Sequence, residues 1–568
     1  MRATPAVFTA ALIAGTMSLS ACGGAEDRDV LGDCGTSPNT CNGGPVREAA
    51  EVKYGIPAAI TNWNLRHAAG TTEAGYAVLT GLMPSAFVLQ PDGVTNAMSK
   101  DLLASVEQAG DDPQTIVYRV RPEAKWSDGT PIGVADFVYN WQVADGKSCP
   151  TCQVATAGYD QIESIKGSDG GKTVTVRFAK PFTDWKMLFS PLLPAHVAAT
   201  YGSLKSAEGL ARGFNEGFVH NVPKWSGGPY RITDVRPNVS VVEQPNPAWY
   251  GTAPRTRRLV FRIVTDSAQL PTALSTKELD ITAMQAEPDL VEQIDALPGI
   301  STHVGTGSTL AQLVLNTRNK GLDTPVRQAI LTAVNRAELI RRVLGPSIGG
   351  RVKAVDSFLF LPAEQGYGDA LAGTGLGSGR ADQATARLTA AGYRLEGGRL
   401  ISPAGKPVPP LRYLYPPDQR TGKLVGTLLA TWLKPLGIEV TPIAGGEFAT
   451  HLGEGGFDIL YISRGVPGFP FFGASVFWTS RGVANFGGLS DPKVDRLVQQ
   501  ASSSGDRAKA APLLAEADRL LAADAPGLPL YAVPTYTAIR SVHANVRPTS
   551  TRFLTYNVEQ WGTRADAG

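Results

Sequence analysis

The residues with the clearest chemical potential in this chain lack the context that a catalytic site needs. Gly345-Pro346-Ser347-Ile348-Gly349 spells G-x-S-x-G, the pattern of a nucleophile elbow, in which a serine attacks a carbonyl carbon. Such an elbow requires a strand before the serine and a helix after it. Here a predicted helix ends at Leu344, and Gly345 is predicted to terminate it. We therefore expect that this protein is not an enzyme.

The histidines and the glycine-rich segment do not form a cofactor site either. The six histidines stand at positions 67, 196, 220, 303, 451 and 543, and none has the H-E-x-x-H spacing or another metal-ligand spacing. The segment 373–379 is rich in glycine but lacks the lysine of a phosphate-binding P-loop. The sequence therefore predicts no metal ion and no cofactor.

The cysteines point to lipidation and to disulfides. Leu19-Ser20-Ala21-Cys22-Gly23 follows an apolar run that is too short to span a bilayer comfortably, and it matches a bacterial lipobox. In a lipobox the cysteine carries the lipid and becomes the mature N-terminus. The alternative is an ordinary secretory signal with an incidental cysteine. Cys22 is the predicted lipidation site and the predicted membrane attachment.

The other four cysteines form an even set, which in an exported protein indicates disulfides. The sequence favours the local pairs Cys34–Cys41 and Cys149–Cys152. Cys149 and Cys152 also form a C-x-x-C motif, which occurs in redox proteins and zinc sites. No thioredoxin-like βαβ pattern surrounds this motif, and a zinc site needs a second pair of ligands nearby. A structural disulfide is the favoured interpretation, with redox and metal roles as alternatives.

The composition is that of a large soluble globular protein. The chain has 568 residues, of which 43% are hydrophobic and 18% charged, and its formal net charge is +2. Lysine and arginine are dispersed, whereas a nucleic-acid surface usually shows a concentrated basic patch, so no nucleic-acid partner is expected. The 62 glycines and 41 prolines indicate many turns and favour a mixed α/β protein. Residues 23–47 are predicted to be a flexible tether.

Residues 115–141 show most clearly which elements carry the fold. Residues 115–120 are predicted to form a strand, because their side chains alternate between two faces. Residues 126–131 spell W-S-D-G-T-P, and Asp-Gly is a strong turn signal. Residues 134–141 are predicted to form an amphipathic helix. The sequence therefore places a strand, a tight turn and a helix in direct succession.

This succession resembles the signature of the bacterial extracellular solute-binding proteins, family 5, the peptide- and nickel-binding lipoproteins of ABC importers, and in particular an actinobacterial branch. The match at Asn64-Leu65-Arg66-His67 to the N-L-D-P loop of the family is partial. Further family motifs match residues 227–232, 246–251, 277–281, 313–317, 326–330, 433–438, 489–495 and 528–531. The resemblance runs from about residue 50 to Trp561.

The resemblance implies an α/β, two-lobed periplasmic-binding-protein-like fold of the cluster C type, with an extra subdomain in lobe I. Residues 1–22 would be the lipoprotein signal peptide. Lobe I would comprise 48–80, 224–308 and 529–568, with an inserted subdomain at 81–223, and lobe II would comprise 309–528. A hinged pair of lobes suits a binding protein, because closure buries the ligand and excludes water.

The resemblance also places a ligand-binding candidate in residues 461–478. In the peptide receptors of this family the segment contains an aspartate that pairs with the free amine of the peptide. Here Arg464 supplies the opposite charge, so we expect it to meet an acidic or carbonyl group. An alternative is that the aromatic side chains of this segment form the core of the lobe. The candidate ligand-binding residues are Arg464, Gly465, Phe469, Phe471, Trp478 and Asn485.

The expected function is capture of a peptide or peptide-like solute and its delivery to an ABC permease. The protein is expected to be a monomer, attached by its lipid to the extracytoplasmic face of the cell membrane. Residues 121–126 and 193–196 also look close to a branch that serves cell-envelope glycolipid synthesis, so a non-peptide ligand is an alternative. A third possibility, an extracellular hydrolase, lacks an evident nucleophile and base.

Overall fold

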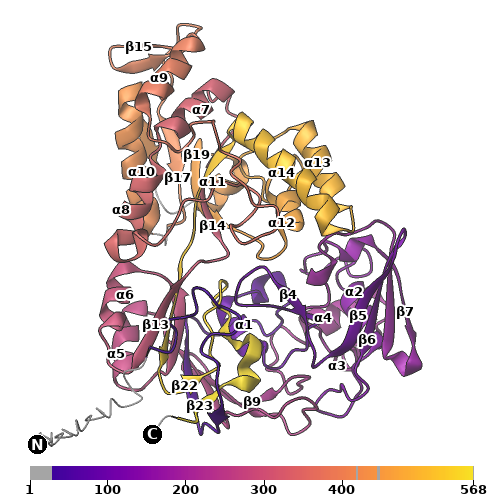
Figure 1. Ribbon diagram of the computed structural model, residues 1–568. Coiled ribbons are helices and arrows are strands. Elements are labelled where there is room, and N and C mark those ends of the chain that lie inside the picture. Colours follow the sequence, from indigo (N-terminus) through magenta and orange to yellow (C-terminus); the bar gives the residue numbers. More distant parts are fainter. Residues whose placement is uncertain (1–28, 418–419, 444–447, 567–568) are drawn as a thin grey trace, which may run out of the picture.

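The computed structural model describes residues 29–417, 420–443 and 448–566 (Figure 1). Sheets of seven, five and four strands each organise one body of the molecule. Two of these bodies lie in the lower part of Figure 1 and share one hydrophobic core, and the third lies above them. The arrangement is the two-lobed α/β fold that the sequence predicts, with a subdomain attached to the first lobe.

Lobe I contains the seven-stranded sheet. Its central strand β2 is parallel to both neighbours, β11 and β12, and the remaining pairs are antiparallel. Helices α1 (Glu73–Leu79), α5 (Leu270–Ser275) and α6 (Pro288–Asp295) belong to this lobe. In sheet order the strands are β13 (Ile300–Gly305), β21 (Thr535–Arg540), β12 (Ile281–Gln285), β2 (Val52–Ile56), β11 (Leu259–Ile263), β10 (Ser240–Pro245) and β9 (Tyr230–Arg236).

Lobe II contains the five-stranded sheet and most of the helices. Strands β14 and β20 are buried along their whole length and are mostly apolar, with Gln312 of β14 as a buried polar side chain. In sheet order the strands are β18 (Val440–Pro442), β17 (Leu411–Leu414), β19 (Ile459–Arg464), β14 (Leu310–Leu315) and β20 (Gly527–Ala532). The helices are α7 (Thr324–Ala333), α8 (Arg336–Gly349), α9 (Ala381–Ala390), α10 (Arg420–Leu433), α11 (Phe448–Glu454), α12 (Pro470–Phe477), α13 (Pro492–Ser502) and α14 (Arg507–Asp524).

The inserted subdomain is an antiparallel sheet covered by short helices. Strand β6 and helix α2 are the strand and helix predicted on either side of the W-S-D-G-T-P turn. Ile116, Tyr118 and Val120 are buried, as the alternation predicts. In sheet order the strands are β5 (Leu103–Asp111), β6 (Gln114–Val120), β8 (Thr173–Phe178) and β7 (Ile162–Ser168), and the helices are α2 (Val134–Gln142), α3 (Ala195–Ala199) and α4 (Ala207–Asn215).

The described part of the chain also contains three small sheets. Strands β1 (Val46–Arg47), β23 (Gly562–Arg564) and β22 (His543–Ala544) join the N-terminal part of the described chain to its C-terminal part. Strands β3 (Phe87–Leu89) and β4 (Asn96–Met98) form a hairpin that faces lobe II. Strands β15 (Arg394–Glu396) and β16 (Arg399–Ile401) form a second hairpin at the far tip of lobe II (Figure 1).

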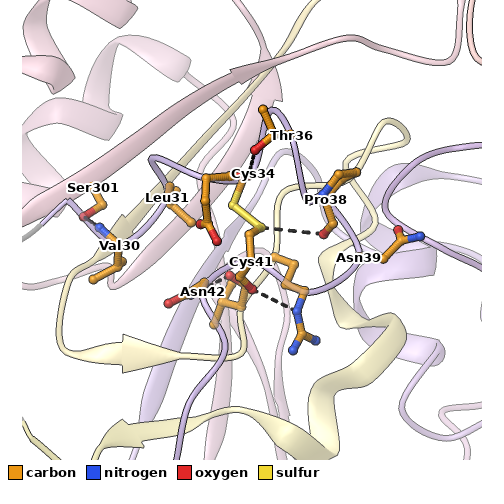
Figure 2. Close-up of a disulfide and its surroundings, with 12 residues drawn as sticks. Val30, Leu31, Cys34, Thr36, Pro38, Asn39, Cys41, Asn42 and Ser301 are labelled. Carbon is orange, nitrogen blue, oxygen red and sulfur yellow. Dashed lines mark hydrogen bonds between the residues drawn. A yellow bond between two sulfur atoms is a disulfide. The ribbon is translucent and has the colours of Figure 1, made fainter.

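The prediction of a flexible tether over 23–47 is wrong from residue 29 onward. A disulfide closes the loop between Cys34 and Cys41 (Figure 2). Leu31 has no exposed surface. The Val30 backbone N–H donates to Ser301 Oγ at 3.0 Å, which fixes the segment to lobe I (Figure 2). Polar composition predicted flexibility, but the disulfide and these long-range contacts hold the segment. Residues 23–28 lie outside the described residues.

The two lobes are joined by two chain crossings that run beside each other. The first passes from β13 to β14 and the second from β20 to β21, and the Val533 backbone N–H donates to the carbonyl of Thr309 at 2.8 Å. A side chain at Gly307 would collide with the Val533 carbonyl, since an added Cβ would lie 1.8 Å from that oxygen. The paired crossings provide the narrow connection that a hinge requires.

Two details differ from the sequence prediction. The helical spacing of the apolar residues after Thr324-Pro325 predicts one helix from Val326 to Ile340. The structure has two helices there, α7 and α8, because Val334 takes an extended conformation between them. The return to lobe I was placed at residue 529, but β20 stays in the lobe II sheet as far as Ala532. The crossing therefore lies after Ala532, and strand pairing rather than sequence similarity defines this boundary.

Candidate functional site

A cavity of ≈ 340 Å³ lies where the two lobes face each other. Lobe I supplies most of its wall, from helix α1, the β3–β4 hairpin and the segment around residue 553. Lobe II supplies the loop between β19 and α12. We call this space the interlobe cavity, and its lining residues are Leu65, Tyr76, Thr80, Met83, Ser85, Phe87, Val88, Leu89, Asn96, Lys186, Met187, Ser190, Pro191, Val466, Pro467, Phe469, Thr551, Phe553 and Tyr556.

The interlobe cavity is mainly apolar and carries one charged side chain. Tyr76 and Phe553 stack with their ring centroids 4.3 Å apart and form a flat aromatic wall. Lys186 is half-buried, and its ammonium lies over the rings of Trp185 and Phe87. Burial, followed by repulsion from Arg507, lowers the pKa of Lys186. None of the lining residues is acidic, so the cavity suits a neutral or anionic solute better than a cationic one.

A smaller cavity of ≈ 80 Å³ adjoins the interlobe cavity and shares Thr80, Met83 and Tyr556 with its lining. It contains two acids, Asp101 and Glu559. Burial and the nearby Asp101 carboxylate raise the pKa of Glu559 to about 7. A positively charged group of a solute would therefore bind in this smaller cavity, next to the carboxylates of Asp101 and Glu559.

The segment 461–478 forms the lobe II side of the site, but its residues take different positions. Phe469 lines the interlobe cavity, whereas Phe471 and Trp478 are each 2% exposed and belong to the lobe II core. Phe471 and Trp478 therefore pack in the core of lobe II, which is the alternative interpretation of these aromatic side chains. Gly465 packs closely, since an added Cβ would lie 2.5 Å from the Ser308 carbonyl of the first crossing.

Asn485 lies away from the cavities. Its Nδ2 donates to the carbonyls of Thr479 at 2.9 Å and Leu489 at 2.8 Å, and its Oδ1 accepts from the Leu489 backbone N–H at 3.0 Å. Both N–H donors of the amide are thus used within its own loop. Its position favours a structural role in the turn after α12.

Arg464 is buried at the end of β19 and lies behind the interlobe cavity rather than in its wall. With Gly465 and Trp478 it lines a separate space of ≈ 40 Å³ inside lobe II. Its Nη1 donates to the Ala484 carbonyl at 2.9 Å, and its guanidinium lies 4.7 Å from the centroids of the Phe477 and Trp478 rings. We call this space the lobe II chamber.

A buried charge cluster joins the subdomain to lobe II. Asp184 Oδ2 accepts from the Phe472 backbone N–H at 2.8 Å, so its carboxylate caps the N-terminus of α12. Arg507 lies 3.4 Å from Asp184 Oδ1 and donates to the Gly468 carbonyl at 2.8 Å. Burial raises the pKa of Asp184 to about 6 and that of Glu364 to about 7, although Arg507 opposes both shifts.

The backbone beside this cluster is also held across the lobes. Thr183 N–H donates to the Ser502 carbonyl at 2.9 Å, and Thr183 Oγ1 donates to the Ala501 carbonyl at 2.6 Å. Asn96 Nδ2 reaches the Gly468 carbonyl at 3.3 Å from the lobe I side. These contacts close the two lobes around the interlobe cavity.

The four cysteines in the described part of the chain form disulfides, and Ser347 lacks the surroundings of a nucleophile elbow. Disulfides join Cys34 to Cys41 and Cys149 to Cys152, the two local pairs that the sequence favours. Gly345 interrupts α8 with a positive φ of 66°, and Ser347 follows it within helical structure rather than after a strand. The strand–turn–helix context of a nucleophile elbow is therefore missing at Ser347.

Comparison with known proteins decides the family. The profile of the bacterial extracellular solute-binding proteins, family 5 (middle region), matches residues 97–487. The chain is a family 5 solute-binding protein. This is a family of binding proteins, and the two-lobed fold described above is its fold. Within the part of the chain that the structure describes, no helix combines the length and the hydrophobicity needed to cross a membrane.

Several family 5 proteins resemble this one over most of its length. The oligopeptide-binding protein OppA of Mycobacterium tuberculosis is 26% identical over 520 residues, which cover 90% of this chain and 84% of OppA. The structure of the periplasmic EDTA-binding protein EppA is 34% identical, with a TM-score of 0.87, and covers 93% of this chain and 99% of EppA. The oligopeptide-binding protein AppA of Bacillus subtilis, in complex with a nonapeptide, shares the fold at 16% identity and a TM-score of 0.73.

Most of the site in this family 5 protein was missed by the sequence analysis. Lys186, Tyr76 and Phe553 are separated by more than a hundred residues and meet only through the arrangement of lobe I. Lys186 follows the Thr183–Asp184 pair that contacts lobe II, but no local motif marks it. The segment that the sequence predicted, residues 461–478, contributes only the lobe II side of the cavity.

Proposed function

We propose that this protein captures a small organic solute in the interlobe cavity and delivers it to an ABC permease. The observation that carries the proposal is the ≈ 340 Å³ cavity, whose walls come from both lobes. The paired crossings at Thr309 and Val533 provide a connection about which the lobes can open and close. Closure would bury the solute and shield its hydrogen bonds from water.

A peptide or peptide-like solute is the first candidate ligand. OppA and AppA, both similar to this chain, are named for oligopeptide binding. The β3–β4 hairpin and the 465–469 loop offer backbone groups near the cavity, and backbone hydrogen bonds suit peptides of varied sequence. The aromatic wall of Tyr76 and Phe553 would receive apolar side chains.

A solute rich in carboxylates is the second candidate, and the charge of the cavity favours it. Among the described residues that line the interlobe cavity, Lys186 is the one with a charged side chain, and none is acidic. EppA, which is 34% identical, is named for binding EDTA, a polycarboxylate. A peptide without an essential free amine would fit the same lining.

Mass spectrometry of the solute released from the purified protein by denaturation tests this function. We expect a small organic molecule in the wild type and in Val483→Ala, a variant of an exposed side chain. Phe469→Ala removes a ring from the cavity wall and should lower the retained solute at least tenfold. Equal amounts in Phe469→Ala and in wild type would contradict a site at the interlobe cavity.

The domain division follows the strands. We propose that lobe I comprises 48–80, 224–308 and 533–566, that the subdomain comprises 81–223, and that lobe II comprises 309–532. These boundaries are supported by the sheets, because β14 and β20 belong to the five-stranded sheet and β21 belongs to the seven-stranded sheet. Limited proteolysis should cut first near the crossings when the lobes are open, and protection there on closure would support the hinge.

We propose that residues 1–22 are a lipoprotein signal and that Cys22 carries the lipid; both lie outside the described residues. The lipobox at 19–23 supports this attachment to the extracytoplasmic face of the membrane. Cys22→Ala should release a folded protein from the membrane fraction and abolish palmitate labelling. Labelling that persists in Cys22→Ala would contradict the assignment.

A further inference from the structure

The lobe II chamber contains a cation that has no ion-pair partner among the described residues. Glu364 also lines this chamber, and burial raises the pKa of its carboxyl to about 7. Arg464 is 8% exposed, and among the described residues no carboxylate lies within ion-pair distance of it. Its Nε is buried and has no hydrogen-bond partner in that part of the chain. Burial lowers the pKa of Arg464 to about 9, which leaves the guanidinium charged at neutral pH. A buried charge that is unpaired in this way is costly for a folded protein.

A second polar side chain in the same chamber also lacks a partner. Gln312 is 2% exposed, and its Oε1 makes no hydrogen bond to the described residues. Strands β14 and β19 are antiparallel, with Leu310 opposite Arg464 and Gln312 opposite Ile462. Because side chains two residues apart share a face, Gln312 and Arg464 point to the same side of the sheet. The sheet therefore presents both unsatisfied groups to one space.

The remaining contacts of Arg464 hold the guanidinium in a fixed plane. Phe477 and Trp478 contact it with their rings, and Nη1 is held by the Ala484 carbonyl. This leaves the buried Nε without a partner among the described residues. Nε and the adjacent Nη2 are the pair of donors that can bind a carboxylate in a bidentate manner. The Gln312 amide can add an N–H donor when it rotates to exchange its oxygen and nitrogen.

We propose that the lobe II chamber binds a carboxylate-type oxyanion through Arg464 and Gln312. The ≈ 40 Å³ of the chamber exceeds the space that one water molecule needs and accommodates a small planar group. Val466 lines both the chamber and the interlobe cavity, so the two spaces share a wall. A carboxylate arm of a captured solute is the first source of the oxyanion. This assignment deepens the proposed function and rests on it, whereas a free oxyanion is a second source that does not.

Two tryptophans provide separate signals for the chamber and for the interlobe cavity. Trp478 contacts the Arg464 guanidinium, and Trp185 lies beside Lys186 and Phe87 at the interlobe cavity. The mature protein, labelled with 5-fluorotryptophan, gives fluorine NMR signals that Trp478→Phe and Trp185→Phe assign. Acetate is the small probe, and EDTA is a probe whose body is too large for the chamber. Chloride at the same ionic strength is the control.

We expect acetate to shift the Trp478 signal in a saturable manner and chloride to leave it unchanged. EDTA should shift both the Trp185 and the Trp478 signals and should weaken the acetate effect at least tenfold, which identifies a solute carboxylate as the source. If acetate shifts the Trp478 signal while EDTA moves neither signal, the chamber holds a free oxyanion. That result keeps the chamber but contradicts a polycarboxylate in the interlobe cavity.

Other outcomes overturn the assignment. If EDTA shifts the Trp185 signal while neither acetate nor EDTA shifts the Trp478 signal, the interlobe cavity binds solute and the chamber does not bind oxyanions. If no probe shifts the Trp478 signal, the chamber assignment is also wrong. The experiment therefore distinguishes a chamber that does not bind oxyanions from an interlobe cavity that does not bind solute.

Variants of the chamber test the roles of charge and geometry. Arg464→Lys keeps the charge but loses the planar fork, and we expect at least tenfold weaker acetate binding. Gln312→Leu should weaken acetate binding several-fold. Arg481→Met removes an exposed arginine from the loop after α12 and should change nothing. Acetate binding by Arg464→Lys that equals wild type would contradict bidentate recognition, and a thermal unfolding curve identifies variants that fail to fold.

Discussion

Two arginines close to helix α12 have similar aromatic neighbours but opposite electrostatic surroundings. Arg464 lies 4.7 Å from two ring centroids in the lobe II chamber, and Arg507 lies 5.6 Å from the Phe471 ring. Arg507 faces two buried acids, Asp184 and Glu364. Arg464 forms no ion pair with a described residue, although Glu364 also lines the lobe II chamber. Arg507 therefore has an ion-pair partner, whereas Arg464 has none among the described residues.

This difference distinguishes two parts of the site. The cluster around Arg507 holds the lobes together, whereas Arg464 has a donor that is unpaired among the described residues and can bind a ligand. The charges around Arg507 come from both sides of the contact, because Asp184 belongs to the subdomain and Glu364 to lobe II. They are complete only when the lobes are closed. The Arg464 charge lies within lobe II alone, so closing the lobes brings no acid to it. We expect the first cluster to respond to pH and the second to respond to anions.

The largest expected effect is a pH dependence of lobe closure. Burial raises the pKa of Asp184 from its usual 3.8 to about 6, so the closed form binds a proton more readily than an open form with Asp184 in water. The stabilisation from this proton is full below about pH 4 and is lost as the pH rises through about 6. Two pKa units correspond to about 3 kcal/mol. Small-angle scattering should show a smaller radius of gyration at pH 4.5 than at pH 7.5.

Asp184→Asn is the matched control for this pH effect. The amide oxygen can still accept from the Phe472 backbone N–H, but the group no longer titrates. The radius of gyration of this variant should change much less between pH 4.5 and pH 7.5. A pH dependence as large as that of wild type would assign the effect to Glu364 or to another group.

The next effect compares the two arginines directly. Arg507→Met leaves Asp184 and Glu364 buried without their cation, and we expect a loss of about 2 kcal/mol of closed-state stability. This is below the usual figure for a fully buried pair, because the Arg507 side chain is 36% exposed. Arg464→Met leaves no acid unpaired and should cost less. Hydrogen exchange at Thr183 and Phe472 measures the loss, and a larger loss in Arg464→Met would contradict the comparison.

A smaller effect concerns the charge of the captured solute. If Arg464 replaces an amine-binding aspartate, a bound peptide and its N-acetylated form should bind equally well, or the acetylated form more tightly. Titration calorimetry measures both affinities. A tenfold loss on acetylation, about 1.4 kcal/mol, would mean that a carboxylate holds the amine. Asp101 and Glu559 in the adjoining cavity are then the residues to test.

The smallest effect on closure is expected from the disulfide in the subdomain. Cys149 and Cys152 are three residues apart, and a loop this short restricts the unfolded chain less than a long one. The double variant Cys149→Ser, Cys152→Ser should remain folded and keep the same radius of gyration at each pH. Free-thiol labelling of both cysteines in the native, non-reduced wild type would contradict the disulfide, and stoichiometric zinc would favour a metal site.

The sequence alone determined the fold class and the local elements around residues 115–141. Strand β6 and helix α2 were predictable because Ile116, Tyr118 and Val120 repeat with the period of a strand, and because an Asp-Gly turn lies between the strand and the helix. The absence of an elbow at Ser347 was predictable for the same reason, since a helix precedes it. These features depend on neighbours in the chain, which the sequence shows directly.

The tertiary structure alone decided the ordering of residues 29–47 and the chemistry of the site. Polar composition predicted a tether, but Ser301, which is 271 residues away from Val30, holds the segment. The sequence drew attention to Arg464, yet its isolation from acids depends on which side chains the β14–β19 pairing brings beside it. Burial and the distances between charges fix both pKa values and binding chemistry, and they arise only when distant segments pack together.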